Sequence, residues 1–480
     1  MLKRYLNLID GKLRTALSGR ELDVRCPSDG LPFAKIPASS AMDINAAVKA
    51  ARAAVDDGEW SHLSAVGRGR LLTKLGDLVL DNLDDLTSIE AMDTGKPMRE
   101  AEQDIRMTAR YFEFYGGSAD KIGGETLPYF NMFNAQVLRE PHGVTGHIIP
   151  WNYPSQIFAR TLAPALAMGN AVVLKPAEQA CLTPIQLAVL AREAGFPKGS
   201  INVVSGTGAM AGAALARHRG IDFLSFTGSP KTGASVAAAA ARNRIACSLE
   251  LGGKSPQIVF EDARKEEYLH ILVQGVIQNA GQTCSAGSRV LVQESMFGEV
   301  LDGLASRFEA LTAGPHDEDP DLGALISKVQ KKRVLRYLNL PDRPHLVAQG
   351  NVSPSAPAGG HYVRPTLFGP ASEHSRLSQE EIFGPVLVCT SFKDERDAVR
   401  IANGTEYGLV AGIWTRDGDR QMRVAKALHC GQVFINSYGA GGGVELPFGG
   451  VGKSGHGREK GMAALHTFSR LKTVVHHHGL

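Results

Sequence analysis

The sequence predicts an α/β protein with two large domains, because of its length and because strands and helices alternate along it. The chain has 480 residues, which is too many for one hydrophobic core of ordinary size. From residue 144 onward, short apolar stretches alternate with helical stretches. This alternation is typical of a parallel sheet with helices on both faces. The composition, 43% hydrophobic and 21% charged, is that of an ordinary soluble protein.

The first 140 residues contain fewer strands. Residues 1–35 are expected to form short strands and turns, and Asp43 to cap the helix that follows them. Leucine and valine recur at helical spacing over residues 71–86, and a helix rich in charge and aromatics is expected over residues 98–115. Residues 119–140 alternate only loosely, so we expect an extended arm there.

The alternating region then divides at a pair of glycines, Gly252 and Gly253. Before the pair we expect strands over 144–149, 171–174, 201–204 and 221–226, with helices over 154–168, 183–195 and 230–241. After it we expect strands over 257–260 and 289–292 around a helix over 266–279, and a surface loop at 350–360. Ligands of such sheets bind at the carboxyl ends of the strands.

Charge and cysteine content narrow the classes of partner. The net charge of +3 gives no reason to expect nucleic acid or an anionic membrane. No stretch is long enough to cross a membrane, and Asp10 and Lys12 interrupt the N-terminal apolar run too early for a signal peptide. The six cysteines are scattered and include no Cys-x-x-Cys pair. This spacing predicts no zinc site and fits a reducing compartment, which we expect to be the cytoplasm.

One cysteine has an unusual setting. Cys284 lies among small and polar residues within residues 278–289, with Gly281 before it and Gly287 after it. A thiolate nucleophile needs such a polar and partly accessible environment, whereas structural cysteines pack among apolar neighbours. Taken by itself, a loop cysteine without a function explains the pattern better.

Two polar stretches follow expected strands. Asn152 lies between a strand and a helix, where its carboxamide can donate into a cleft or cap the helix. Lys175 and Glu178 come just after another strand. They are placed to hold ribose hydroxyls, as an acid does in dinucleotide-binding folds, or to form a solvated loop pair.

Two further stretches could bind phosphate or supply a base. Residues 226–233 leave a strand and open a helix, so their amides can meet a pyrophosphate, although the usual glycine fingerprint is missing. Glu250 lies at the end of an apolar strand. Such surroundings disfavour the charged carboxylate and can prepare it as a base, or the side chain can pair with Lys254.

Taken in order, these stretches resemble the aldehyde dehydrogenase superfamily across nearly the whole chain. Two motifs downstream, around Glu381 and Glu459, extend the likeness. The seven shared motifs are Pro-Trp-Asn, Lys-Pro-Ala-Glu, Phe-Thr-Gly-Ser, Glu-Leu-Gly-Gly-Lys, Gly-Gln-x-Cys, Glu-Glu-Ile-Phe-Gly-Pro-Val and Leu-Pro-Phe-Gly-Gly with Ser-Gly-His-Gly-Arg-Glu. The chain departs from the family at Pro230-Lys231, where Thr-Glu is frequent, and at Gly452, where lysine is usual. Neither departure touches a catalytic position.

The resemblance implies the architecture. It implies a Rossmann-like cofactor domain of residues 1–118 and 140–250 and an α/β catalytic domain of residues 251–450. Residues 119–139 and 451–480 would form a small β oligomerisation arm and the C-terminal tail. This arm would add an edge to the sheet of a second subunit, so a homodimer or a homotetramer is expected.

The resemblance also implies residue roles. Cys284 is the nucleophile, Asn152 stabilises the oxyanion, and Glu250 activates water to hydrolyse the thioester. No metal is predicted. NAD is the expected cofactor because Glu178 would repel the 2′-phosphate of NADP, with NADP use left open by the nearby Lys175. The implied cofactor-binding residues are Ile149, Trp151, Lys175, Glu178, Gly208, Gly212, Phe226, Gly228, Ser229, Gly233, Glu381 and Phe383.

By the same resemblance, the substrate meets the helix after Asn152. Tyr153, Ile157 and Arg160 share one helical face. Succinate semialdehyde dehydrogenases carry an arginine at the place of Arg160, where it binds a carboxylate with paired hydrogen bonds. Their second arginine is absent here, since Gln278 takes its place. We therefore expect an aldehyde with an anionic or strongly polar far end, and the alternative is that Arg160 forms an internal salt bridge.

Three rival functions fit these residues less well. An acylating relative that passes the thioester to coenzyme A generally lacks the glutamate found at position 250. A cysteine hydrolase needs a histidine partner, and none occurs in the stretches around Cys284 or Glu250. A catalytically silent relative of the fold would have no reason to combine Cys284, Glu250 and Asn152.

Overall fold

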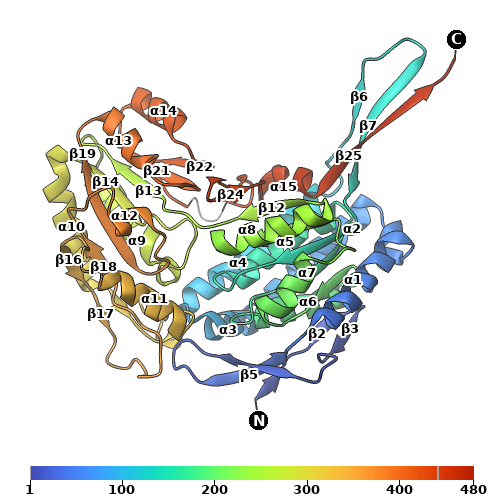
Figure 1. Ribbon diagram of the computed structural model, residues 1–480, viewed down its shortest axis with the longest axis horizontal. Coiled ribbons are helices and arrows are strands. Elements are labelled where there is room, and N and C mark those ends of the chain that lie inside the picture. The colour runs from blue at the N-terminus through green and yellow to red at the C-terminus, as the bar shows by residue number, and fades with distance from the viewer. Residues whose placement is uncertain (1, 440–442, 480) are drawn as a thin grey trace.

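The computed structural model describes residues 2–439 and 443–479. Two open sheets, each flanked by helices, form two lobes that face one another, and a narrow β ribbon projects from one of them (Figure 1). We call the lobe around the eight-stranded sheet the first lobe and the lobe around the seven-stranded sheet the second lobe. The structure is thus of mixed α/β class, as the alternation of elements predicts.

The first lobe is built on a sheet in the order β24-β12-β11-β8-β9-β10-β2-β3. Neighbours from β12 to β10 pair in parallel, whereas β24, β2 and β3 are antiparallel additions. The strands are β2 (Asn7–Ile9), β3 (Lys12–Arg14), β8 (Val144–Ile148), β9 (Ala171–Lys175), β10 (Ile201–Val203), β11 (Phe223–Thr227), β12 (Ala246–Glu250) and β24 (Gly455–His456).

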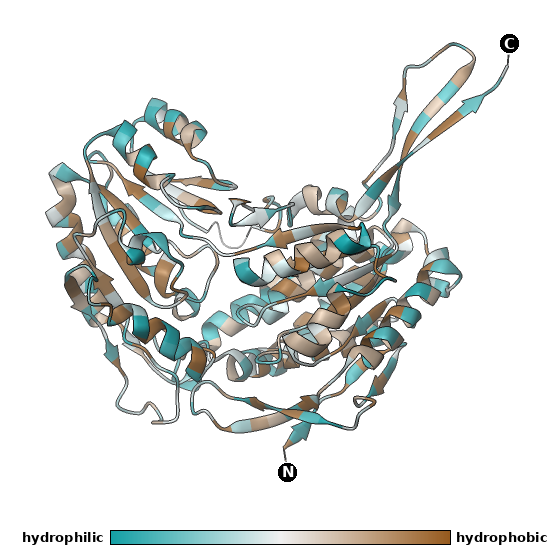
Figure 2. Ribbon diagram, viewed as in Figure 1, coloured by the Kyte–Doolittle hydropathy of each residue, from teal (hydrophilic) through white to brown (hydrophobic). Residues whose placement is uncertain are grey.

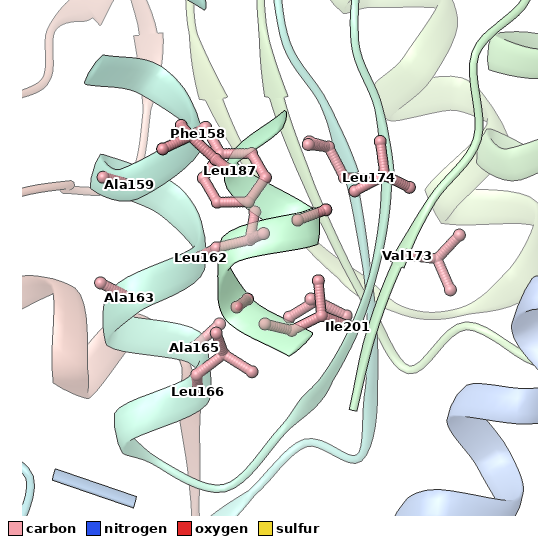
Figure 3. Packing of buried hydrophobic residues seen from close by; sticks show 14 of the residues in the cluster. Phe158, Ala159, Leu162, Ala163, Ala165, Leu166, Val173, Leu174, Leu187 and Ile201 are labelled. Atoms are coloured by element: carbon pink, nitrogen blue, oxygen red, sulfur yellow. The ribbon is translucent and has the colours of Figure 1, made fainter. Parts of the chain in front are cut away.

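Helices cover this sheet and share its core. Figure 3 shows Phe158, Leu162 and Leu166 pointing from one helix toward Leu187 of another and toward the strands. These three side chains recur at i, i+4 and i+8, so they share one buried face. The helices are α1 (Ala41–Asp56), α2 (Ala65–Asp81), α3 (Leu83–Thr94), α4 (Met98–Ser118), α5 (Pro154–Ala167), α6 (Leu182–Ala194), α7 (Ala213–Ala216), α8 (Pro230–Asn243) and α15 (Gly461–Thr467).

The second lobe has the order β16-β18-β19-β14-β13-β21-β22, with only β16 antiparallel. Figure 2 shows apolar residues concentrated on the strands and polar residues on the outer helices. Its elements are β13 (Pro256–Val259), α9 (Lys265–Ile277), β14 (Arg289–Gln293), α10 (Phe297–Ala310), α11 (Lys328–Leu338), β16 (Leu346–Gln349), β18 (Thr366–Phe368), α12 (Arg376–Gln379), β19 (Val386–Phe392), α13 (Glu395–Ala402), β21 (Val410–Trp414), α14 (Gly418–Ala427) and β22 (Gln432–Ile435).

The projecting ribbon is an antiparallel sheet in the order β25-β7-β6. Its strands are β6 (Glu125–Leu127), β7 (Phe133–Pro141) and β25 (Ser469–His477), so the extended arm expected over residues 119–140 is present. Short sheets elsewhere are formed by β1 (Lys3–Arg4), β4 (Glu21–Arg25) and β5 (Pro32–Pro37), by β15 (Thr312–Ala313) and β17 (Asn351–Val352), and by β20 (Tyr407–Gly408) and β23 (Val451–Gly452).

Several local predictions need correction. Ser40, not Asp43, caps α1, and Asp43 instead closes a capping box by accepting the Ser40 backbone N–H at 2.8 Å. The helix expected over 71–86 is two helices that meet at Asn82. α6 begins at Leu182, earlier than the Thr-Pro pair suggested. α9 ends at Ile277 because the backbone turns left-handed two residues later.

The C-terminal segment serves both the ribbon and the first lobe. β24 pairs with β12, and α15 contacts α5, before the chain enters β25. Leu465 and Phe468 belong to the core of the first lobe. The last 30 residues therefore complete the first sheet as well as the ribbon.

Candidate active site

A cavity of about 330 Å³ is lined by residues of both lobes. β8, β11 and β12 are neighbours in the first sheet and end at its edge. The loops that follow them contribute Asn152, Gly228 and Leu251, and the second lobe contributes Cys284 and Phe383. Ligands of parallel sheets bind at this edge, so the cavity lies where the sequence predicts a site.

Cys284 lies in the loop before β14 and faces the cavity. The backbone just before it is unusual, because Asn279, Ala280 and Gly281 all have left-handed φ angles of 50°, 53° and 74°. A side chain on Gly281 would place its Cβ 2.2 Å from the carbonyl of Gly384. This close approach fixes the loop and gives the glycine a structural reason.

Opposing effects act on the pKa of the Cys284 thiol, and the net result is a rise. Burial raises its pKa to about 11, while the positive charges of Arg160 and Lys460 act in the opposite direction. The thiol is therefore protonated at neutral pH and needs a base before it can act as a thiolate.

Asn152 lies in the turn between β8 and α5 and is 5% exposed. Its Nδ2 donates to the carbonyl of Gln282 at 2.9 Å, which ties it to the loop that carries Cys284. Its Oδ1 is buried without a hydrogen-bond partner among the described residues. The N-cap residue of α5 is Tyr153, which makes no side-chain capping bond, so Asn152 is not the N-cap of this helix. The arrangement agrees with a residue that faces the cavity.

Glu250 ends β12 and is 2% exposed. Burial raises the pKa of its carboxyl well above the usual value, and the nearby negative charge of Glu459 adds to this, while Arg160 opposes it. Neither oxygen has a hydrogen-bond partner among the described residues. The alternative pairing with Lys254 is absent, and burial lowers the pKa of that lysine to about 7.

The residues predicted to hold ribose hydroxyls lie in two places. Lys175 Nζ contacts Glu178 Oε2 at 2.9 Å, and Glu178 Oε1 accepts from the backbone N–H of Gly208 at 3.4 Å. Lys175 is 2% exposed and the Glu178 side chain is 28% exposed, so the pair is partly buried rather than fully solvated. Glu381 accepts from the backbone N–H of Gly253 at 2.9 Å and lines the cavity.

Other predicted cofactor residues line the cavity. Trp151 and Phe383 pack edge to face with ring centroids 5.5 Å apart, and Phe383 has a φ of 63°. Ser229 caps α8 by accepting from Thr232, and Pro230 is the first residue of that helix. Gly228 and Ser229 line the cavity, so the start of α8, where an anion can bind a helix, lies at its edge.

The remaining predicted cofactor residues do not line the cavity. Ile149 and Phe226 are buried in the first lobe, and Gly233 packs against Leu251, where a Cβ would approach to 2.6 Å. Gly208 is exposed, and a Cβ there would meet no atom within 4 Å. A Cβ on Gly212 would lie 3.8 Å from Cδ of Lys175, an ordinary contact distance. Gly233 therefore has a packing reason in this structure.

Tyr153, Ile157 and Arg160 all line the cavity from α5. The hydroxyl of Tyr153 lies 2.7 Å from Thr283 Oγ1, beside Cys284. Arg160 Nε lies 2.5 Å from Glu459 Oε2, and both side chains are buried. Although burial opposes the charge, Glu459 raises the pKa of the Arg160 guanidinium. The structure thus contains the internal salt bridge that was the alternative interpretation of Arg160.

Comparison with known proteins identifies the family. The model of the aldehyde dehydrogenase family matches residues 14–474. The chain belongs to the aldehyde dehydrogenase family. Aldehyde dehydrogenase 1 of Tanacetum cinerariifolium is 41% identical over 97% of this chain and 94% of its own length.

Solved structures of aldehyde dehydrogenases agree. The NAD+ complex of an aldehyde dehydrogenase from Bacillus cereus has a TM-score of 0.96 at 37% identity, over 99% of this chain and 97% of that one. A protein from Burkholderia cenocepacia reaches a TM-score of 0.97 at 54% identity, over 99% and 100%. The resemblance, the aldehyde dehydrogenase fold and the reaction class, oxidation of aldehydes, are confirmed.

The structure brings to the site two residues to which the sequence analysis gave no role, Glu459 and Lys460. Glu459 pairs with Arg160, and Lys460 lines the cavity beside it. Burial and the charge of Arg160 lower the pKa of Lys460 to about 8. The motif Gly457-Arg458-Glu459 is a signal in the sequence, and reading one residue further would have included the lysine.

The described part of the chain contains neither a candidate membrane span nor a candidate metal cluster. No helix there is both long and apolar enough to cross a bilayer. Groups of three or more His, Cys, Asp or Glu side chains placed to hold a metal were also not found among those residues.

Proposed function

We propose that this protein oxidises an aldehyde to a carboxylic acid with NAD, through a thioester on Cys284. One observation carries the proposal. Cys284, Asn152 and Glu250, which are far apart in the sequence, all line the same cavity. A nucleophile, a hydrogen-bond donor and a carboxyl with a raised pKa are what acyl chemistry on sulfur requires.

The first step forms the bond to sulfur. The Cys284 thiolate attacks the aldehyde carbon, and the π electrons of the carbonyl move to oxygen. The Asn152 side-chain amide and the Cys284 backbone N–H would donate to that oxyanion. Losing one such donor costs roughly a hundredfold to a thousandfold in rate. Because burial raises the pKa of Cys284 to about 11, a base must first take the thiol proton.

Glu250 would complete the cycle. After the C–H bond has given up its hydride, the carbonyl reforms as a thioester. Glu250 removes a proton from water, the hydroxide adds to the thioester, and the C–S bond breaks to return the thiolate and release the acid. The pKa of Glu250 is raised by burial, which makes its carboxylate a stronger base once it is ionised.

The residues around the cavity fit NAD. NAD, when bound, would accept the hydride. Outside the cavity lining, Glu178 with Lys175 would hold the adenine ribose; at the cavity, Ser229 and Gly228 would meet the pyrophosphate, and Glu381 with Phe383 the nicotinamide ribose. A Cβ on Gly252 would lie 2.4 Å from Glu381 Oε2, so the glycine gives that carboxylate its place. The negative charge of Glu178 favours NAD over NADP.

The test is the formation of reduced nicotinamide, followed by its absorbance, with a panel of aldehydes. We expect NAD reduction without added coenzyme A and a higher kcat/KM with NAD than with NADP. Glu178→Gln should raise the relative efficiency with NADP, whereas Glu193→Gln, an exposed acid near the end of α6, is the matched control. A clear NADP preference of the wild type contradicts the role of Glu178, and a requirement for coenzyme A contradicts hydrolysis by Glu250.

For the substrate, we propose an aldehyde with an anionic or strongly polar far end. Arg160 and Lys460 approach the ring of the same residue, Phe448, with their charged groups each 5.2 Å from its centroid. All three line the cavity. Glu459 pairs with Arg160, and the charges of Glu459 and Glu250 also act on Lys460, so we assign both cations to the binding of an anionic substrate.

For the assembly, we propose that the β25-β7-β6 ribbon pairs with a second copy of the chain. Tyr129 and Phe130 near its tip are 56% and 68% exposed, and Leu471 and Val475 on β25 are also exposed. An exposed apolar edge of this kind is a site for pairing with another strand. Domain boundaries at residues 118, 140 and 250 remain part of this proposal. Most of the proposed cofactor residues precede Gly252, whereas Cys284, Glu381 and Phe383 follow it.

A further inference from the structure

A second buried cluster of charges lies against the backbone of Asn152 and consists of Glu90, Lys96 and Asp104. Lys96 is 1% exposed and contacts Asp104, with Glu90 at 3.8 Å. It comes just after α3, where Gly95 ends the helix with a φ of 79°. Burial opposes its charge, yet the two carboxylates raise its pKa, so Lys96 is a cation.

Lys96 also contacts the residue at the oxyanion position. Its Nζ donates to the backbone carbonyl of Asn152 at 3.0 Å. The same carbonyl accepts from Asn279 Nδ2 at 2.8 Å. Asn279 is held in turn, because its backbone N–H donates to Glu100 at 2.9 Å.

These contacts tie two loops of the cavity to each other. The side-chain N–H of Asn152 donates to the backbone carbonyl of Gln282. The side-chain Nε2 of Gln282 donates in turn to the backbone carbonyl of Asn279 at 3.1 Å. Asn279 and Gln282 both lie in the loop that carries Cys284. Two buried donors, one of them charged, thus hold the backbone carbonyl of Asn152. The side chain of Asn152 is held by its own hydrogen bond to the loop that carries Cys284.

Stability gives a weak reason for such a cluster. Buried ion pairs frequently contribute little to stability, because desolvation offsets the attraction of the charges. Oxyanion donors, in contrast, must be held within about 0.5 Å of their working position. A cation that grips the backbone of such a donor meets that requirement.

We propose that Lys96 is a positioning residue for aldehyde oxidation, which holds the carbonyl of Asn152 together with Asn279 and so aims the Asn152 carboxamide at the reacting oxygen. This inference rests on the proposed function. Lys96 does not line the cavity and acts only through Asn152.

The test is a double-mutant cycle in the full-length protein. Lys96→Met should lower kcat for the oxidation of an aldehyde by about a hundredfold, as displacement of a reacting group by roughly 1 Å does. The KM for NAD should stay unchanged. In the Asn152→Ala background the same substitution should lower kcat by no more than about twofold, because the two residues act as a unit. Lys96→Arg, which keeps charge and donors, should recover part of the activity.

Asn279→Gly keeps the test decisive if Lys96→Met does not fold. Glycine accepts the left-handed backbone of Asn279, and the substitution removes one donor without unpairing a buried charge. It should give the same loss, again absent in Asn152→Ala. Equal losses in both backgrounds, or a full kcat in Asn279→Gly, overturn the role of Lys96. If the wild type reduces NAD with none of the aldehydes tested, the proposed function itself is wrong, and the inference about Lys96 fails with it.

Discussion

The two buried charge clusters on either side of Asn152 differ in what surrounds them. In the cluster of Glu90, Lys96 and Asp104, the lysine contacts a carboxylate and a backbone carbonyl, and of the three side chains only Asp104 lines the cavity. In the cluster of Arg160, Glu459, Glu250 and Lys460, the charges of Arg160, Glu250 and Lys460 act on Cys284, and the charge of Glu459 acts on Glu250 and Lys460. Both oxygens of Glu250 lack partners among the described residues.

This difference separates positioning from chemistry. A buried carboxyl that accepts no hydrogen bond is costly, and Glu250, which lines the cavity, is such a group. Lys96 instead holds the backbone of Asn152. Perturbed ionisable groups in a cleft are candidates for function, whereas Lys96, which does not line the cavity, acts as a support.

Removal of the Cys284 thiol is the strongest test of the cluster of charged residues around Glu250. Cys284→Ala should abolish aldehyde oxidation, because no other nucleophile can form the thioester. Binding of NAD should persist, which can be measured by quenching of protein fluorescence or by calorimetry. Cys430→Ala is the matched control, since Cys430 does not line the cavity. A steady-state rate near that of the wild type in Cys284→Ala would rule out the assignment.

Loss of the base should give the next largest effect. Glu250→Gln should lower turnover by about a hundredfold to ten-thousandfold while sparing the first hydride transfer, so a burst of NADH equal to the number of sites precedes a slow phase in stopped flow. In the wild type, kcat should rise with pH, because the carboxyl must lose its proton and its pKa is raised by burial. A turnover rate that falls as pH rises from neutrality would contradict the role of Glu250.

The smallest effect compares the two cations. Lys460→Met should lower the ratio of efficiencies on succinate semialdehyde and butanal by about tenfold, the cost of one charge-assisted hydrogen bond. Arg160→Leu should also lower that ratio, because Arg160 lines the same cavity and approaches the same ring of Phe448. The preference should also fall as pH rises through about 8, where Lys460 loses its proton. If either substitution lowers both substrates alike, or if the wild type prefers butanal, the anionic substrate is excluded.

The sequence predicts much of the fold and the candidate site. Alternating apolar and helical stretches predict the parallel strands, because burial on both faces leaves a continuous apolar pattern. The Asp43 prediction failed for a local reason, since serine and aspartate both accept from a helix start and only the geometry selects Ser40. The single helix expected over 71–86 failed because the leucines remain in phase across Asn82.

The sequence by itself determined the family, the reaction class and the identity of the residues around Cys284. The reason is that each motif is a short run of adjacent residues, which can be recognised before the fold is known. Only the tertiary structure decided how charges combine. Arg160 and Glu459 are 299 positions apart and form an ion pair, and Lys96 grips a carbonyl 56 positions away. Electrostatic energy depends on distance and burial, and neither quantity is present in a linear order of residues until the chain folds.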